Sequence, residues 1–240
     1  MNLFVPPRRF DPAVPEMMDR PTDDVAILRD DLNNLRTINK YFGGLSSVQN
    51  AFLPLIERVD AAKSIEVLDL ATGSADHPVA LVKLARTRRR FIHITAVDKN
   101  PHMLAVAREL TASYPEITVT PGDILSPGFP DKRFDIVLCS LAIHHFSRED
   151  AVTILRNMAR ISRVGFIVND LSRSRLGAWT AWFYTHLTTR NPMTLYDSYV
   201  SVLRAFTPHE LAQMAHEAGI RNFAINTRPF FRLILVGQYI

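Results

Sequence analysis

The sequence contains a single cysteine, Cys139, among 240 residues. A disulfide framework within the chain is therefore excluded, and this cysteine usage is typical of a reducing cytoplasm. The longest apolar runs are far shorter than a membrane span, and the amino terminus has its arginines after its apolar residues, the reverse of a secretory signal. We therefore expect a cytoplasmic protein without a membrane span.

The sequence also lacks a group of His, Cys and carboxylate residues at metal-ligand spacing, so we expect no metal site. Its net charge of +4 is mild, and the densest basic run, Arg86–Arg90, lies where a helix is expected to end. Positive charge at that end favours the helix dipole, so the run is typical of a solvated helix terminus. The charge pattern therefore argues against a nucleic-acid partner.

Glycine is scarce in the stretch around which the chain is organised. An apolar, β-branched run at 65–70 leads into a loop of small residues, and a helix is expected at 77–89. The loop holds one glycine, Gly73, so it matches neither the dinucleotide fingerprint nor a phosphate-binding lysine loop. The next strand, 91–98, ends in Asp98, and a carboxylate at that position can accept both hydroxyls of a ribose.

Strands and helices continue to alternate along the chain. Further strands are expected at 117–120, 134–140, 164–168, 221–227 and 231–237, with helices at 101–114 and after Ser147. This alternation predicts an α/β fold with a doubly wound, mostly parallel sheet and ligands at its carboxyl edge.

The two flanking regions have a different composition. Residues 1–22 carry five prolines and predict an extended arm. Within it, Met17 and Met18 could pack in the core, lie in an interface or contact the substrate. Two helices should follow within 23–59. Residues 172–206 hold seven aromatic side chains, among them Trp179 and Trp182. These aromatics either form the buried face of a helix or wall a pocket for a flat, apolar substrate.

Several of these segments together resemble the class I S-adenosylmethionine (SAM)-dependent methyltransferases. The matching pieces, which occur in the family's order, are residues 67–75, Asp98 with 101–104, Gly122-Asp123-Ile124, 134–140, and His144-His145-Phe146. The resemblance implies a seven-stranded, Rossmann-like sheet closed by an antiparallel hairpin. It divides the chain into an arm with lid helices at 1–60 and a SAM-binding domain at 61–240, with a cap inserted at 172–206.

The same resemblance implies the cofactor, SAM, with S-adenosylhomocysteine (SAH) as its product. Asp69 would help to hold the methionine end, Asp98 the ribose and Asp123 the adenine amine. The residues implied in cofactor binding are Asp69, Ala71, Thr72, Gly73, Asp98, Lys99, Met103, Asp123, Ile124 and Ser140. Ala71 and Ala75 stand where the family usually has glycine, and their methyl groups are tolerated if φ is negative there.

The catalytic candidates follow two strands that should be neighbours. His144 and His145 come after the strand at 134–140, and Asp170 comes just after the strand at 164–168. A carboxylate beside an imidazole fixes its tautomer and raises its basicity, so this set predicts a general base for an acceptor hydroxyl. Between the two histidines we favour His144.

The His-His-Phe turn resembles ubiquinone, menaquinone and natural-product methyltransferases. That resemblance leaves the substrate open. The aromatic segment and a histidine base together favour a small apolar or aromatic acceptor, methylated on a hydroxyl oxygen. Nitrogen or carbon acceptors stay open, as do an RNA or protein substrate, a SAM-binding module without catalysis, and a homodimer.

Overall fold

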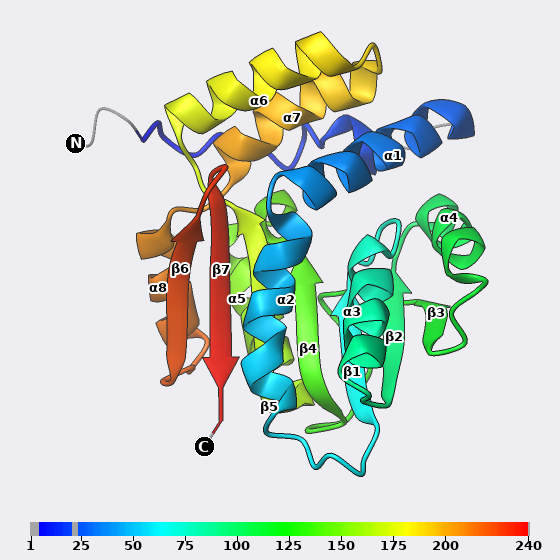
Figure 1. Ribbon diagram of the computed structural model, residues 1–240. Helices are drawn as coiled ribbons and strands as arrows, with labels where there is room; N and C mark the ends of the chain where they lie inside the picture. The colour runs from blue at the N-terminus through cyan, green and yellow to red at the C-terminus, as the bar shows by residue number, and fades with distance from the viewer. Residues whose placement is uncertain (1–4, 21–23, 240) are drawn as a thin grey trace.

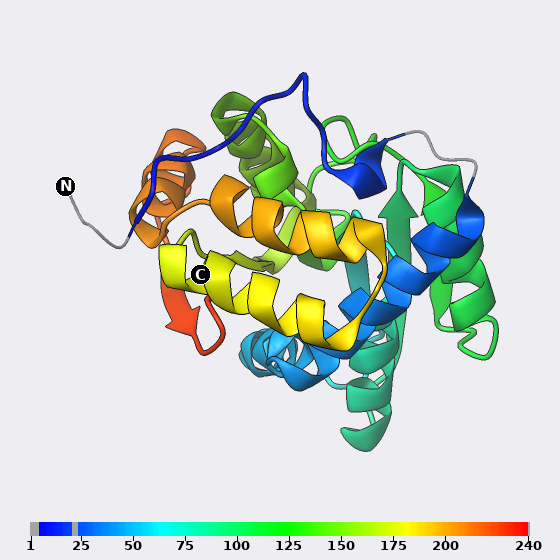
Figure 2. The same ribbon diagram turned by 90° about the horizontal axis from the view of Figure 1, so that it is seen from above.

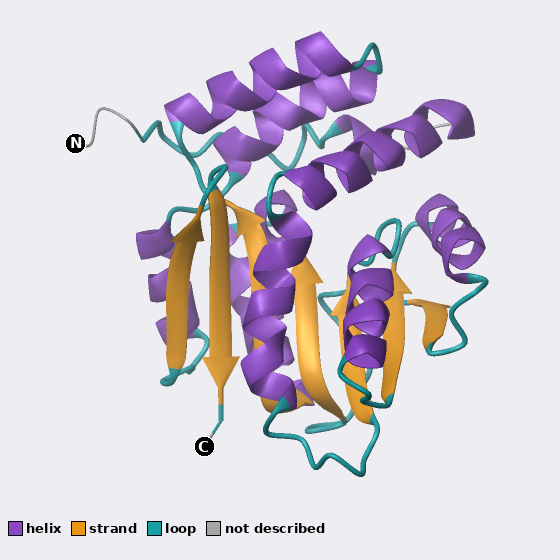
Figure 3. Cartoon of the chain, in the orientation of Figure 1, coloured by secondary structure: helices purple, strands orange, loops and turns teal. Residues whose placement is uncertain are grey.

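The computed structural model describes residues 5–20 and 24–239. Its centre is a seven-stranded sheet of order β3-β2-β1-β4-β5-β7-β6, in which β7 alone runs antiparallel to its neighbours (Figures 1 and 3). The strands are β1 (Ile65–Leu70), β2 (Ile92–Asp98), β3 (Ile117–Pro121), β4 (Phe134–Ser140), β5 (Ser162–Leu171), β6 (Phe223–Arg228) and β7 (Arg232–Gln238). The predicted α/β fold, its parallel sheet and its closing hairpin are confirmed.

Helices cover both faces of the sheet and its carboxyl edge. They are α1 (Val25–Tyr41), α2 (Gly44–Ile56), α3 (Asp76–Thr87), α4 (Pro101–Thr111), α5 (Arg148–Ile161), α6 (Arg175–Thr188), α7 (Pro192–Arg204) and α8 (Pro208–Glu217). Short 3₁₀ turns lie at Met17–Asp19 and Ile143–His145. None of the helices in the described part of the chain is both long and apolar enough to cross a membrane.

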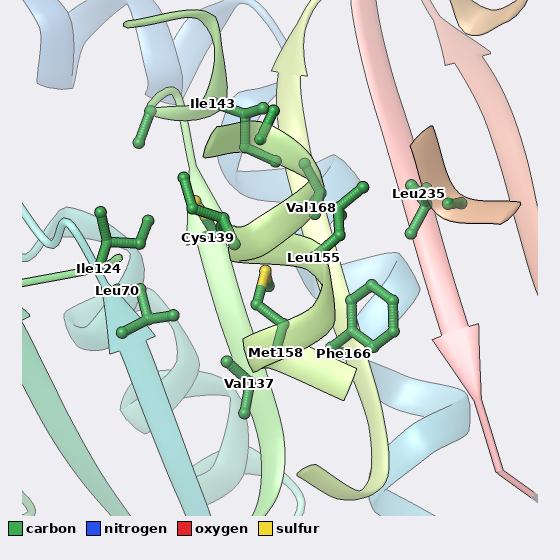
Figure 4. Packing of buried hydrophobic residues seen from close by; sticks show 14 of the residues in the cluster. Leu70, Ile124, Val137, Cys139, Ile143, Leu155, Met158, Phe166, Val168 and Leu235 are labelled. Carbon is green, nitrogen blue, oxygen red and sulfur yellow. The ribbon is translucent and has the colours of Figure 1, made fainter. Parts of the chain in front are cut away.

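The two faces of the sheet hold separate hydrophobic clusters. On one face, Phe52 and Leu55 of α2 and Leu81 of α3 pack against the strands. On the other face, α5 packs through Leu155 and Met158 (Figure 4). Alternate strand residues serve the two sides, as Val137 and Cys139 do for one cluster and Ile136 and Leu138 for the other. Burial on both faces explains why these strands appear in the sequence as continuous apolar runs.

The register of the parallel strands brings their carboxyl ends to one edge. Asp69 lies opposite Leu138, and Ser140 lies opposite Asn169. The strand order reverses between β1 and β4, and ligands of doubly wound sheets bind at such a switch point.

Helices α1, α6 and α7 form a layer over this edge (Figures 1 and 2). The N-terminal arm, residues 5–20, runs along α7. Its contacts include Arg9 N to Leu203 O at 3.0 Å and the donation by Met17 N to Asp197 Oδ1 at 2.8 Å. The arm is therefore bound to the layer that covers the carboxyl edge.

Three of the aromatic side chains of α6 do not lie where the sequence predicted. Trp179, Trp182 and Phe183 are exposed and line neither of the two cavities described below. Both interpretations of these three residues, a buried helix face and a pocket wall, are therefore wrong. They occupy the side of α6 that faces away from the sheet, whereas smaller residues, Ala178 among them, fill the buried side.

Candidate active site

The loop after β1 is held by the carboxylate that precedes it. Asp69 is buried, and its Oδ2 accepts a hydrogen bond from Thr72 Oγ1 at 2.6 Å. Burial outweighs this bond and raises the pKa of Asp69 to about 8. The loop needs left-handed backbone: φ is +57° at Ala71, +54° at Gly73 and +56° at Ala75. The condition of negative φ at the two alanines is therefore not met, and each costs roughly 1–2 kcal/mol of conformational strain.

Asp98 joins the loops after β1 and β2. Its Oδ2 accepts from Gly73 N at 2.9 Å and its Oδ1 from Asn100 N at 2.9 Å. Burial raises the pKa of this carboxyl in spite of these donors. Each carboxylate oxygen has a further lone pair, so Asp98 can still accept hydrogen bonds from a ligand.

A cavity of about 650 Å³ lies between these loops and α1. All ten residues implied in cofactor binding line it: Asp69, Ala71, Thr72, Gly73, Asp98, Lys99, Met103, Asp123, Ile124 and Ser140. Lys99 Nζ pairs with Asp123 Oδ2 at 3.0 Å, and the apolar Met103 and Ile124 lie in the same wall. Carboxylates can accept hydrogen bonds from hydroxyls and an amine, and apolar side chains can contact a flat ring. This combination fits SAM.

A second cavity, of about 470 Å³, lies under α6 and α7. Its walls come mainly from α1, α6, α7 and the β6–β7 hairpin, and they include Ile38, Phe42, Tyr184 and Phe231. The two cavities share Met18, Leu35, Leu141 and His145 in their walls. The two cavities therefore adjoin each other at this shared boundary.

His144 and Asp170 meet beside this boundary, as the strand order predicted. His144 Nδ1 lies 2.5 Å from Asp170 Oδ1, and the backbone nitrogen of His144 donates to Asp170 Oδ2 at 3.1 Å. Although burial raises the pKa of Asp170, its contacts with His144 hold that pKa below the ordinary value. Asp170 is therefore a carboxylate at neutral pH and fixes the Nδ1–H tautomer of His144.

His145 belongs to a second pair. Its Nδ1 lies 2.6 Å from Asp19 Oδ2, and Glu16 Oε1 is 4.0 Å away. Burial lowers the pKa of His145, but Glu16 and Asp19 together raise it to about 9. His145 is consequently a cation at neutral pH.

Glu16 and Asp19 come from the N-terminal arm, and the sequence analysis missed both. The arm has no hydrophobic periodicity and no motif, so no local signal marks them. Glu16 is fully buried, and its Oε1 lies 3.9 Å from His144 Nε2 and 3.6 Å from Arg204 Nη1. Ser201 Oγ donates to its other carboxylate oxygen.

Glu16, His144 and His145 also bring three metal-ligating atoms within 4.8 Å of one another. The sequence spacing does not reveal this group, because Glu16 is remote in the chain. The ion pair with Arg204 and the pairing of both imidazoles with Asp170 and Asp19 account for the cluster as a network of charges.

Two further buried acids that the sequence analysis missed, Asp31 and Asp197, line the second cavity. Asp31 of α1 accepts from Thr194 Oγ1 at 2.6 Å, and its Oδ2 has no hydrogen-bond partner among the described residues. Burial raises the pKa of Asp31 to about 7.

Known proteins were compared with this chain in sequence and in structure. A family model described as a methyltransferase domain matches residues 67–165. The chain is 25% identical over 187 residues to the demethylmenaquinone methyltransferase of Bacillus licheniformis. The aligned region covers 73% of this chain and 78% of the relative.

Two solved structures show the same fold. A SAM-dependent methyltransferase from Aquifex aeolicus has a TM-score of 0.61 at 13% identity, over 97% of this chain and 100% of the other. The CurJ carbon methyltransferase has a TM-score of 0.63 at 14% identity, over 90% of this chain and 61% of the other. The matched domain and the sequence relative support a class I SAM-dependent methyltransferase, and the solved structures show the same fold.

Proposed function

We propose that this enzyme methylates a hydroxyl of a small apolar or aromatic acceptor, and that His144, oriented by Asp170, is the general base. The observation that carries the proposal is the 2.5 Å contact of His144 Nδ1 with Asp170 Oδ1, in a residue that lines the acceptor-side cavity. Because Nδ1 is occupied, Nε2 is the nitrogen that takes a proton from the acceptor.

The size and walls of the cavity support a small acceptor. A volume of about 470 Å³ under a helical layer suits one molecule of modest size, and side chains such as Phe42, Tyr184 and Phe231 suit an apolar or aromatic one. An RNA or protein substrate would have to place its reacting group beneath α6 and α7. The small-molecule assignment therefore fits the geometry better.

The ten residues of the other cavity are assigned to the cofactor on the same basis. Asp98 would receive the ribose hydroxyls, Asp123 would receive the adenine amine, and Met103 and Ile124 would contact the adenine ring. When bound, SAM would supply an electrophilic methyl group to the acceptor oxygen and would leave as SAH. The acceptor proton moves to His144 Nε2, and the imidazolium is stabilised by Asp170 and by Glu16 Oε1 at 3.9 Å.

His145 has a different role in this proposal. Its pKa of about 9 makes it a poor base at neutral pH. It lines both cavities, so its positive charge lies beside the reacting oxygen and favours the acceptor anion.

A carbon acceptor is the second candidate, because a carbon methyltransferase is among the solved structures that share this fold. CurJ is named a carbon methyltransferase, and the same base could remove the proton of a phenol or enol whose neighbouring carbon then attacks. Isotope-labelled SAM followed by NMR of the product distinguishes a new O-methyl group from a new C-methyl group.

The His144→Ala variant tests the proposed base. With a phenolic acceptor that the wild type methylates, we expect turnover to fall by about 10²-fold or more, the usual size of a general-base contribution. SAM affinity, measured by calorimetry, should stay unchanged. His209→Ala, which removes an exposed histidine on α8, is the matched control. Full turnover in His144→Ala would mean that catalysis proceeds without this base.

A further inference from the structure

Helix α6 carries a row of large apolar side chains on its outer side. Leu176, Trp179, Trp182, Phe183 and Leu187 are 40% to 70% exposed in the described structure. Four of them follow the spacing of one helical face, and Trp182 lies at its edge. Single exposed hydrophobic residues are ordinary, but a continuous row of this size marks an interaction surface. We call these five residues the outer row of α6.

The opposite side of α6 is apolar as well. Gly177 and Ala181 line the acceptor-side cavity, and Ala178 is buried against α7. A helix that is hydrophobic all round is normally buried on all sides. In α6 one side is satisfied by the enzyme itself, so the outer row needs another apolar environment.

Charge within the α6 segment has one sign, although Asp30 of α1 accepts a hydrogen bond from Asn191 just beyond the end of the helix. No Asp or Glu occurs between 171 and 196, while Arg175 and Arg190 are exposed near the two ends of the helix. If α6 paired with α6 of a second copy in a two-fold antiparallel contact, Arg175 would approach the partner copy's basic end without an acid to neutralise it. Phosphate groups of an anionic lipid surface would neutralise both arginines instead.

The wall of the acceptor-side cavity reaches the protein surface at the β6–β7 hairpin. Phe230 lines the cavity, is 55% exposed and contacts Phe42 at 5.0 Å between ring centroids. Figures 1 and 2 show α6 as the outermost helix of the layer that covers this cavity. If α6 met a bilayer, an apolar acceptor dissolved in it would have a route to the cavity past the exposed Phe230.

We propose that the outer row of α6 docks the enzyme on the surface of a membrane that contains anionic lipids. Tryptophan is suited to this position because its ring is apolar and its N–H remains hydrated at the interface. The docking is peripheral, and it is independent of which atom of the acceptor is methylated.

The experiment uses the two tryptophans, both of which lie in α6, as reporters. Vesicles of phosphatidylcholine alone, or with one quarter phosphatidylglycerol, are titrated into the full chain at low salt. We expect a blue shift of tryptophan emission and co-sedimentation with the anionic vesicles, both weakened by added salt. A Leu176→Ser, Phe183→Ser double variant, which keeps both tryptophans, should bind at least tenfold more weakly.

Phe91→Ser is the matched control, because Phe91 is 73% exposed just before β2, at the opposite end of that strand from Asp98. Its vesicle binding should equal that of the wild type. Absence of binding by the wild type, or an equal loss in Phe91→Ser, would overturn the proposal. So would light scattering that shows a wild-type dimer which the double variant converts to a monomer, since a second copy would then cover the row. Neither result bears on turnover, which is measured separately with His144→Ala.

Discussion

The Oε1 atom of Glu16 lies 3.9 Å from Nε2 of His144, so a carboxylate of the N-terminal arm faces the nitrogen to which we assign proton transfer. The same oxygen lies 4.0 Å from Nδ1 of His145. One buried charge therefore acts on both imidazoles, and the arm is part of the site.

Glu16→Gln should lower the pKa of His145. Glu16 is the strongest of the contacts that raise this pKa to about 9 against the effect of burial. We expect the pKa to move towards its ordinary value near 6.5 while Asp19 continues to hold it partly raised. NMR titration of the histidine side chains between about pH 6 and 10 measures the shift. Glu217→Gln, which removes an exposed carboxylate paired with Arg148, is the control, and an unchanged His145 in Glu16→Gln would contradict the assignment.

Replacement of Asp98 by Ala should weaken SAM binding at least tenfold. Charge-assisted hydrogen bonds are worth roughly 1.5–3 kcal/mol each, and the ribose would lose its charged acceptor. Asp98 also holds Gly73 N and Asn100 N, so the loops themselves should loosen. Calorimetry with SAM and SAH gives the affinities, with the exposed Asp60→Ala as the comparison. Equal affinity in Asp98→Ala and wild type would place the cofactor elsewhere.

Ala71→Gly should leave the free energy of unfolding nearly unchanged or raise it slightly. Glycine relieves the strain of positive φ, which offsets the entropy that it adds to the unfolded chain. Ala80→Gly, inside α3 with ordinary helical backbone, should instead lose about 1 kcal/mol or more. Urea denaturation of both variants measures the contrast, and equal losses would show that Ala71 is not strained.

Asp31→Asn should stabilise the protein increasingly as pH rises from 5 to 8. Burial raises the pKa of this acid from 3.8 to about 7 in the folded state. Between these values the folded state binds more protons than the unfolded state, so the Asp31 contribution lowers stability as pH increases. Asn can still accept the Thr194 hydrogen bond, and the advantage of the variant should grow by up to about 2–3 kcal/mol over that interval. Asp30→Asn makes the same change in formal charge at an exposed neighbour, and a pH-independent advantage of Asp31→Asn would contradict the burial argument.

The sequence was sufficient for those parts of the site that parallel strands deliver. Asp98 ends β2, whose apolar residues are easily recognised, and Asp123 lies two residues after β3. Asp170 and His144 could be paired because the ends of β4 and β5 must lie side by side once the sheet is parallel. The order of strands along the chain thus carries positional information without any knowledge of side-chain packing.

The remaining contributions depend on contacts that no local pattern encodes. Glu16 and Asp19 reach the site because the arm follows α7, which only the tertiary structure determines. Trp179 and Trp182 misled the analysis because aromatic residues at helical spacing usually mark a core, whereas here they lie on the outer side of α6. The positive φ of Ala71 was unpredictable for a similar reason. Tertiary contacts hold its loop, among them the hydrogen bond from Gly73 N to Asp98, and alanine alone disfavours this conformation.

The partition of the two cavities among the elements has a consequence for how such an enzyme diversifies. The loops after β1 and β2 surround the cofactor side together with α1, while α6, α7, α1 and the β6–β7 hairpin supply most of the walls on the other side. Helices α6 and α7, unlike α1, line only this second cavity, so their lining residues can change without disturbing the methyl donor. Acceptor choice is modular in this architecture, and grafting a different pair of α6 and α7 onto the same sheet is the direct route to a new acceptor.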